Sequence, residues 1–367
     1  MQAYALQETL TRLGHETEIL SYSPTKIENW KLKFINHSVK ATVDYKINEL
    51  YVKLKSGSAE TGHNNMHLFD DFRAQQMRFS RPCSTKEEML EIGREYDAYI
   101  CGSDQIWSPF YFDPVYALSF VDEPWKKIAY APSFGVNSIP EHSKARLGKW
   151  IKQINSISVR EKNGEQIVKQ IAGRISTTVV DPTLLLGKDD WEKLAKGPKY
   201  RKPYIACYFL RKNEGYHSFV QTLAQKLNCE IRLIPMVMGD YERDYAIKEP
   251  VGPQQWLDLI KNADFVVTDS FHCTVFSIVF QKSFATFRAF SDGNIRSQNS
   301  RIDRLLEMCE LEDRIVSFET TEIEMIEPGR LQRASQRIDE MASLSRGWLI
   351  NAIKSAEEKK CCINCGV

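Results

Sequence analysis

The stretch FVVTDSFHCTVFSIVF begins at Phe265 and is an apolar run that Asp269, Ser270 and His272 interrupt. Its first three residues have the composition of a short buried strand, and the residues from Cys273 onward can continue as an apolar helix. The polar residues therefore fall at a strand-to-helix turn, where an open α/β sheet binds ligands and the helix start offers unpaired N–H groups to an anion. The alternative is structural: Asp269 or Ser270 caps the helix, and His272 is an ordinary half-buried histidine.

A second polar cluster follows the stretch YDAYIC and consists of Gly102, Ser103, Asp104 and Gln105. A glycine there lets a ligand approach the backbone, and the three polar side chains can bind hydroxyl groups. Trp107 comes next to this cluster, and we expect its ring to lie against the face of a sugar. The alternative is a tight turn in which Asp104 is a cap.

Arginines near the ends of predicted strands are candidate ligands for an anion. Arg160 follows the apolar stretch SISV, and its guanidinium fork fits a carboxylate or phosphate with two bonds. The alternative is an exposed pair with Glu161, which would contribute under about 1 kcal/mol. Arg288, Arg296 and Arg301 surround a glycine-containing loop and could line the cleft that holds the histidine, although such loops are often only solvated. We favour Arg288 and Arg301.

The elements that must position these residues alternate in the order strand, loop and helix. In the first half, apolar stretches run into polar turns at 96–107, 126–135, 156–164 and 177–186. In the second half, strands are expected at 203–210, 229–237, 265–267 and 283–290, with helices at 215–228 and 254–263. This rhythm is typical of parallel strands with helical crossovers, and therefore of an α/β fold.

The length of 367 residues predicts two domains at ~150 residues per domain, with a cleft between them. We expect an N-terminal lobe at 1–190 with a helix at 2–14, a strand at 16–22 and a polar, mostly helical insertion at about 26–94. The strand that should precede the first helix is missing from the sequence. A charged segment at 187–203 should carry the crossing to a C-terminal lobe at 200–325, and a helical tail at 326–367 should pack back on the first lobe.

The composition is that of an ordinary globular protein, with 43% hydrophobic residues, 26% charged residues and a net charge of +1. This balance gives no global electrostatic reason to bind nucleic acid. No apolar run is long enough for a membrane span, and no signal segment follows Met1, so we expect a cytoplasmic protein. Scattered cysteines within apolar stretches favour a reducing compartment; they are Cys83, Cys101, Cys207, Cys229, Cys273 and Cys309.

The sequence ends in CCINCGV, in which Cys362 and Cys365 have the C-x-x-C spacing. Tetrahedral zinc and cubane iron–sulfur sites each need four ligands, whereas three cysteines are present here and two of them are adjacent. We therefore expect this end to bind no metal and to be disordered and oxidisable. If the gene continues past Val367, the same cysteines could begin a ferredoxin-like module.

The motifs GSDQIWSP, IAYAPSFG, SVREKNG, VVDPTLLL and TDSFHCTVFSIVF, in this order, resemble the polysaccharide pyruvyl transferase family. The resemblance extends from Gln2 to about Arg314. It implies two Rossmann-like lobes that face a cleft, as in GT-B glycosyltransferases, with the acceptor on the first lobe and the donor on the second. It also implies transfer of the enolpyruvyl-derived unit of phosphoenolpyruvate to a sugar as a ketal, without a metal or cofactor.

The resemblance implies that Arg160 and His272 bind the donor, and that a basic residue after the next strand, for which Arg288 is the match, assists them. Many relatives carry an arginine two residues before the histidine, where this chain has Ser270. The expected roles are catalytic for His272, Asp104 and Asp269, donor-binding for Arg160, Ser270, Arg288 and Arg301, and acceptor-binding for Ser103, Gln105, Trp107 and Ser133.

The implied acceptor is a sugar of a capsular or extracellular polysaccharide, or its lipid-linked precursor, which would bring the protein to the inner face of the membrane. Two alternatives remain open. A GT-B glycosyltransferase that uses a nucleotide sugar would need a glycine-rich diphosphate loop and a ribose-binding carboxylate, and neither stands out. The chain could instead be a non-catalytic sugar-binding relative, an alternative that the missing N-terminal strand favours.

Overall fold

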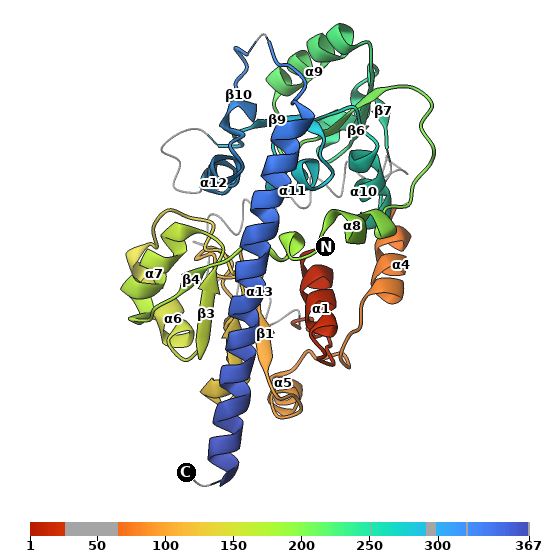
Figure 1. Cartoon of the computed structure of the whole chain (residues 1–367). Helices are drawn as coiled ribbons and strands as arrows, with labels where there is room; N and C mark the ends of the chain where they lie inside the picture. Colours follow the sequence, from red (N-terminus) through yellow and green to blue (C-terminus); the bar gives the residue numbers. More distant parts are fainter. Residues whose placement is uncertain (26–64, 250, 291–298, 321, 366–367) are drawn as a thin grey trace. The chain divides into compact units, whose positions relative to one another are not determined.

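The computed structural model describes residues 1–25, 65–249, 251–290, 299–320 and 322–365 (Figure 1). Arg296 and most of the expected insertion lie outside the described residues. The chain divides into two compact units. Unit 1 contains the described N-terminal residues, Met77–Leu185 and the chain from Met341 onward, and unit 2 contains Leu186–Glu340 together with α4 (Met66–Gln76).

Unit 1 is built on a four-stranded parallel sheet with the order β1-β2-β3-β4. Cys101 pairs with Ala129, which pairs with Ile157, so neighbouring strands end at the same edge. The strands are β1 (Tyr99–Cys101), β2 (Lys127–Ala129), β3 (Ser156–Val159) and β4 (Thr177–Thr178). The helices are α1 (Gln2–Arg12), α5 (Lys86–Ile92), α6 (Glu141–Ile151) and α7 (Lys162–Ala172).

The predicted strand at 16–22 is wrong, because this segment forms only isolated bridges. Ile19 is bridged to Phe79 and Tyr22 to Cys83. Pro82 lies between the two partners and has no N–H to donate, which prevents a continuous ladder.

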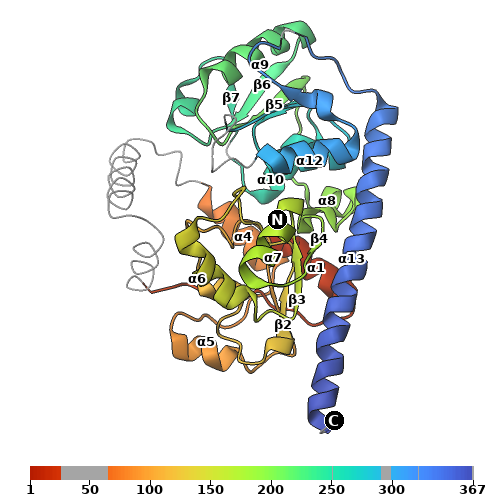
Figure 2. The ribbon, with the colours of Figure 1, turned by 90° about the vertical axis from the view of Figure 1, so that its left-hand side faces the viewer.

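Unit 2 contains a six-stranded parallel sheet with the order β10-β9-β8-β5-β6-β7. Its helix α9 packs on β5 and β6, as Figure 2 shows, and α11 packs on β8 and β9. The strands are β5 (Tyr204–Tyr208), β6 (Glu230–Ile234), β7 (Ile247–Lys248), β8 (Phe265–Thr268), β9 (Ser283–Phe287) and β10 (Ile315–Val316). The helices include α8 (Lys188–Leu194), α9 (Glu214–Leu227), α10 (Pro253–Lys261), α11 (Phe271–Val279) and α12 (Asn299–Cys309). The α/β class with two parallel sheets is therefore confirmed.

The boundary between the units lies at Leu185 and Leu186, earlier than the charged segment at 187–203 suggested. That segment contains α8, whose Trp191 is fully buried and lies edge-on to Phe276 with 4.9 Å between ring centroids. Helix α8 also packs on α10, and burial of the large Trp191 ring holds it against the core, so the segment belongs to unit 2.

Helix α4 also belongs to unit 2, although the sequence placed it in an insertion of the first lobe. It packs on α10, and the contact is close: a Cβ on Gly252 would lie 2.4 Å from the Cβ of Leu68.

The C-terminal helix α13 (Pro328–Cys365) is 38 residues long, and its part from Met341 onward belongs to unit 1. There, Ser345 Oγ accepts the backbone N–H of Val180 at 3.0 Å. The helix includes Cys365, so the expectation of a disordered end is wrong for the backbone up to that residue. No helix among the described residues combines the length and apolar character that a membrane span requires.

Candidate functional site

The sequence-predicted site residues lie just beyond the carboxyl ends of parallel strands. In unit 1, Asp104 follows β1 and Arg160 follows β3; in unit 2, His272 follows β8 and Arg288 follows β9. The carboxyl edge of an open parallel sheet is where ligands bind in α/β proteins. Each unit therefore has polar candidate site residues at the carboxyl edge of its own sheet.

Ser270 is the N-cap of α11. Its Oγ accepts the backbone N–H of Cys273 at 3.4 Å, and its own N–H donates to Thr268 Oγ1 at 3.0 Å. The residue is 3% exposed. The hydroxyl that was expected to bind the donor is thus already engaged in capping, which is the structural alternative for this residue.

Asp269 is a buried carboxylic acid at the same turn. Its Oδ1 accepts the backbone N–H of Leu210 at 2.7 Å, and only 3% of the residue is exposed. Burial raises the pKa of Asp269 to about 6, although the Leu210 N–H and the positive charge of Arg211 partly oppose this shift. An acid with such a pKa can take up and release a proton near neutral pH, which suits general acid–base chemistry.

His272 lies in the first turn of α11 and is half-buried. Its ring is edge-on to Phe271, with 5.2 Å between centroids. The guanidinium of Arg301 lies 5.4 Å from the centroid of the same Phe271 ring. Arg301 lies in the first turn of α12, so α12 and the start of α11 meet at the Phe271 ring beside His272.

Two more arginines follow the strands on either side of β8. Arg288 comes directly after β9, and its Nε donates to Asp303 Oδ1 at 3.0 Å while 46% of its side chain stays exposed. Arg211 follows β5, and its guanidinium lies 3.9 Å from the centroid of the Phe290 ring. Sequence analysis missed Arg211, although a basic residue right after the apolar stretch PYIACYFL was a signal for it.

In unit 1, Arg160 is part of a buried ion pair rather than an exposed pair with Glu161, so that alternative is wrong. Its Nη1 lies 2.8 Å from Asp181 Oδ2, and its Nη2 lies 3.4 Å from Asp104 Oδ1. The side chains of Arg160 and Asp181 are 3% and 0% exposed, and that of Asp104 is 52% exposed. Burial acts to lower the pKa of Arg160, but the surrounding carboxylates, Asp181 first, outweigh it and raise the pKa.

Ser103 and Ser133, the two serines that were expected to bind the acceptor, are also buried within hydrogen-bond networks. Ser103 Oγ lies 3.2 Å from Asp181 Oδ2, and Ser133 Oγ is bonded to the carboxylate of Glu161. The backbone is crowded here, since a Cβ on Gly102 (φ +134) would meet the carbonyl oxygen of Tyr130 at 1.9 Å. A glycine is required at this position for the end of β1 to approach β2.

Trp107 does not have the expected role. It has no exposed surface, and its indole Nε1 donates to the carbonyl of Tyr116 at 3.2 Å. Its ring packs in the core of unit 1 against Phe134, 5.5 Å away. The pattern of an aromatic beside polar residues did not reveal which way the ring points, and we remove Trp107 from the acceptor-binding set. Gln105, in contrast, is half-buried, and its side chain lies beside Gly135.

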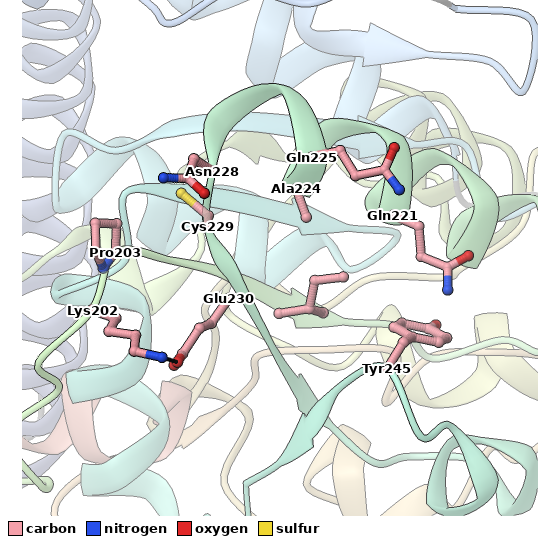
Figure 3. A pocket seen from close by; sticks show the side chains of 10 residues that line it. Lys202, Pro203, Gln221, Ala224, Gln225, Asn228, Cys229, Glu230 and Tyr245 are labelled. Atoms are coloured by element: carbon pink, nitrogen blue, oxygen red, sulfur yellow. Dashed lines mark ion pairs between the residues drawn. The ribbon is translucent and has the colours of Figure 1, made fainter.

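A hollow of about 840 Å³ lies elsewhere in unit 2, between α9 and the amino ends of β5 and β6 (Figure 3). Lys202 and Glu230 on its wall form an ion pair at 2.9 Å. The hollow is at the strand edge opposite to His272 and contains none of the predicted site residues. No group of three or more potential metal ligands occurs among the residues that the structure describes.

Similarity to solved structures is low. A putative UDP-N-acetylglucosamine 2-epimerase from Listeria monocytogenes has a TM-score of 0.49 at 11% identity, with 94% of this chain and 98% of that chain covered. The glycosyltransferase SnogD from Streptomyces nogalater has a TM-score of 0.43 at 13% identity, with 96% and 95% covered. MurG from Acinetobacter baumannii has a TM-score of 0.40 at 11% identity, with 97% and 95% covered. These likenesses carry no argument about this chain.

No curated protein matches the chain. The family comparison is decisive, because the sequence model of polysaccharide pyruvyl transferases matches residues 1–288, well over half of the 367 residues. The match includes the Arg160, Asp269 and His272 motifs, and it confirms the resemblance. The chain belongs to the polysaccharide pyruvyl transferase family.

Proposed function

We propose that this transferase moves the enolpyruvyl-derived unit of phosphoenolpyruvate onto a sugar, as a ketal, in a cell-surface polysaccharide or its lipid-linked precursor. The observation that carries the proposal is that His272 and Asp269 lie at the same strand-to-helix turn. Asp269 is a buried acid with a pKa of about 6, and His272 is two residues away in the first turn of α11. Two proton-exchanging groups at the carboxyl edge of a sheet suit a reaction that begins with protonation.

The donor carries a carboxylate and a phosphate, so its site needs two regions rich in positive charge or N–H groups. Unit 2 offers Arg211 after β5, Arg288 after β9 and Arg301 beside Phe271. These arginines come from elements next to β8 and α11, because β8 pairs with β5 on one side and with β9 on the other. We assign these arginines and the start of α11 to the donor, with Arg160 of unit 1 as the further ligand that the resemblance implies.

In the proposed chemistry, His272 donates a proton to the methylene carbon of the donor, which becomes a methyl group. The neighbouring carbon then forms bonds with two sugar hydroxyl oxygens, and its bond to the phosphate oxygen breaks, so inorganic phosphate leaves. One hydroxyl proton replaces the proton that His272 gave, and the other leaves with phosphate. Asp269 or the exposed Asp104 accepts the hydroxyl protons during the attack.

We assign the acceptor to Ser103 and Gln105, which follow β1 in unit 1, and we leave out Ser133 because it is as fully buried as Trp107. A lipid-linked acceptor would bring this enzyme from the cytoplasm to the inner face of the membrane. No nucleic acid, metal or cofactor enters the proposed reaction.

The test is direct binding followed by turnover. Titration calorimetry with phosphoenolpyruvate should show saturable binding, whereas a UDP-sugar at the same concentration should not. With a library of sugar acceptors, inorganic phosphate should appear together with a ketal product that mass spectrometry detects. Binding of a UDP-sugar without binding of phosphoenolpyruvate would favour the glycosyltransferase alternative, and binding of neither would contradict the donor assignment.

A further inference from the structure

Asp181 in the motif VVDPTLLL is a point where several parts of unit 1 meet. Its Oδ2 accepts hydrogen bonds from Gln2 Nε2 at 2.7 Å and Arg160 Nη1 at 2.8 Å, and it lies 3.2 Å from Ser103 Oγ. Its Oδ1 accepts the N–H and the hydroxyl of Thr183, at 3.0 and 2.8 Å. The carboxylate thus joins side chains from α1 and from beyond β1 and β3.

The backbone beside Asp181 is itself held on both sides. The N–H of Val180 donates to Ser345 Oγ of α13 at 3.0 Å, and the carbonyl of Val180 accepts the hydroxyl of Tyr130 at 3.1 Å. Val180 and both partners, Ser345 and Tyr130, are buried. A carboxylate on so constrained a backbone has little freedom to move, and it therefore imposes its position on the groups that bind it.

A buried ion pair is a poor way to stabilise a fold, because apolar residues of similar volume often stabilise it as well. What the Asp181–Arg160 pair does define is the orientation of the guanidinium group. Asp181 holds Nη1 of the guanidinium, which turns Nη2 toward Asp104, the exposed member of the cluster. The same Oδ2 atom is one of two acceptors beside the Ser103 hydroxyl, at 3.2 Å; the other is the Ala131 carbonyl oxygen at 3.1 Å.

We propose that Asp181 is a positioning residue that sets the side chains of Arg160 and Ser103, and so controls donor and acceptor binding together. It acts through these residues and does not touch substrate. This inference rests on the proposed function, in which Arg160 is a donor ligand and Ser103 an acceptor ligand.

The experiment compares Asp181→Asn with Thr183→Val in the full chain. Asp181→Asn keeps the shape but cannot accept from Arg160 and Thr183 at once, because one of its two terminal atoms is a donor. Thr183→Val removes only the hydroxyl that binds Oδ1, and it leaves Oδ2 with its partners. We expect at least a tenfold rise in the calorimetric Kd for phosphoenolpyruvate and in the KM for acceptor with Asp181→Asn, and less than a twofold change with Thr183→Val.

Two further variants keep the test decisive. If Asp181→Asn fails to fold because it leaves a buried guanidinium unpaired, Asp181→Glu retains the charge and displaces the carboxylate by one methylene; we expect it to fold and to bind the donor several-fold more weakly. In an Arg160→Lys background, Asp181→Asn should produce no further tenfold loss of donor affinity, because the positioned fork is already gone.

The outcomes separate the two proposals. A wild-type chain that does not bind phosphoenolpyruvate overturns the proposed function and this inference with it. A wild-type chain that binds it, with folded Asp181→Asn or Asp181→Glu binding equally well, overturns the positioning role alone. Equal losses in Asp181→Asn and Thr183→Val would show that the carboxylate serves the local turn instead.

Discussion

Replacing Asp269 by asparagine should change how the stability of the protein depends on pH. The pKa of Asp269 rises from 3.8 to about 6 in the folded protein, chiefly through burial. Between these values the folded state binds more protons than the unfolded state, so this carboxyl lowers stability as pH rises through that window. A shift of roughly 2 units corresponds to ~3 kcal/mol at 1.36 kcal/mol per unit, an upper limit for the effect at pH 7.

Asp269→Asn removes the titrating carboxyl group but keeps an oxygen that can accept the Leu210 N–H. In the wild-type protein this nitrogen lies 2.7 Å from Asp269 Oδ1. The difference in free energy of unfolding between the variant and wild type should be small near pH 4. It should grow with pH and reach up to ~3 kcal/mol in favour of the variant at pH 7. Urea unfolding at several pH values measures this difference. Asp264→Asn is the matched control, because Asp264 Oδ2 accepts the Tyr204 N–H at 2.9 Å but the residue is exposed. Parallel stability curves for wild type and Asp269→Asn would refute the reasoning.

Three further predictions concern His272, Arg160 and Trp107. His272→Ala should abolish ketal formation while circular dichroism and unfolding stay near wild type; retained pyruvylation would exclude its role as the acid. Arg160→Lys should raise the calorimetric Kd for phosphoenolpyruvate at least tenfold, because a point charge replaces a fork that binds in two directions, and an unchanged affinity would count against Arg160 as a donor ligand. Trp107→Ala should lower the free energy of unfolding by ~3–5 kcal/mol, since the ring is fully buried; a loss limited to acceptor binding would restore its sugar-stacking role.

The C-terminal cysteines give a last prediction. Elemental analysis of the 367-residue chain should find no stoichiometric zinc or iron, since three cysteines supply fewer ligands than either site needs. Metal that is present at one equivalent and lost in Cys365→Ser would contradict this expectation.

The order of strands and helices could be read from the sequence because local patterns cause it. Apolar runs such as FVVT become strands buried on both faces, and the polar residues that interrupt them mark the turns. Ser270 shows the limit of such patterns: its type indicated a cap and a ligand equally, and only the 3.4 Å contact with the Cys273 N–H assigned its hydroxyl to the helix. The type of a residue limits which groups its side chain can bind, whereas the residue's neighbours in the folded structure decide which group it binds.

The sequence by itself determined the α/β class, the family and the turns that carry Arg160, Asp269 and His272, because these depend on short stretches of chain. The tertiary structure alone decided which side chains meet across distant segments. It placed Trp107 in the core, moved α4 and α8 into unit 2, and added Arg211 beside Phe290. It also joined Asp181 to Arg160 and Gln2, whose sequence separations of 21 and 179 residues no local pattern can bridge. Such pairings form only when the strands of the whole sheet have come together, and burial then decides whether a charged group is solvated or paired.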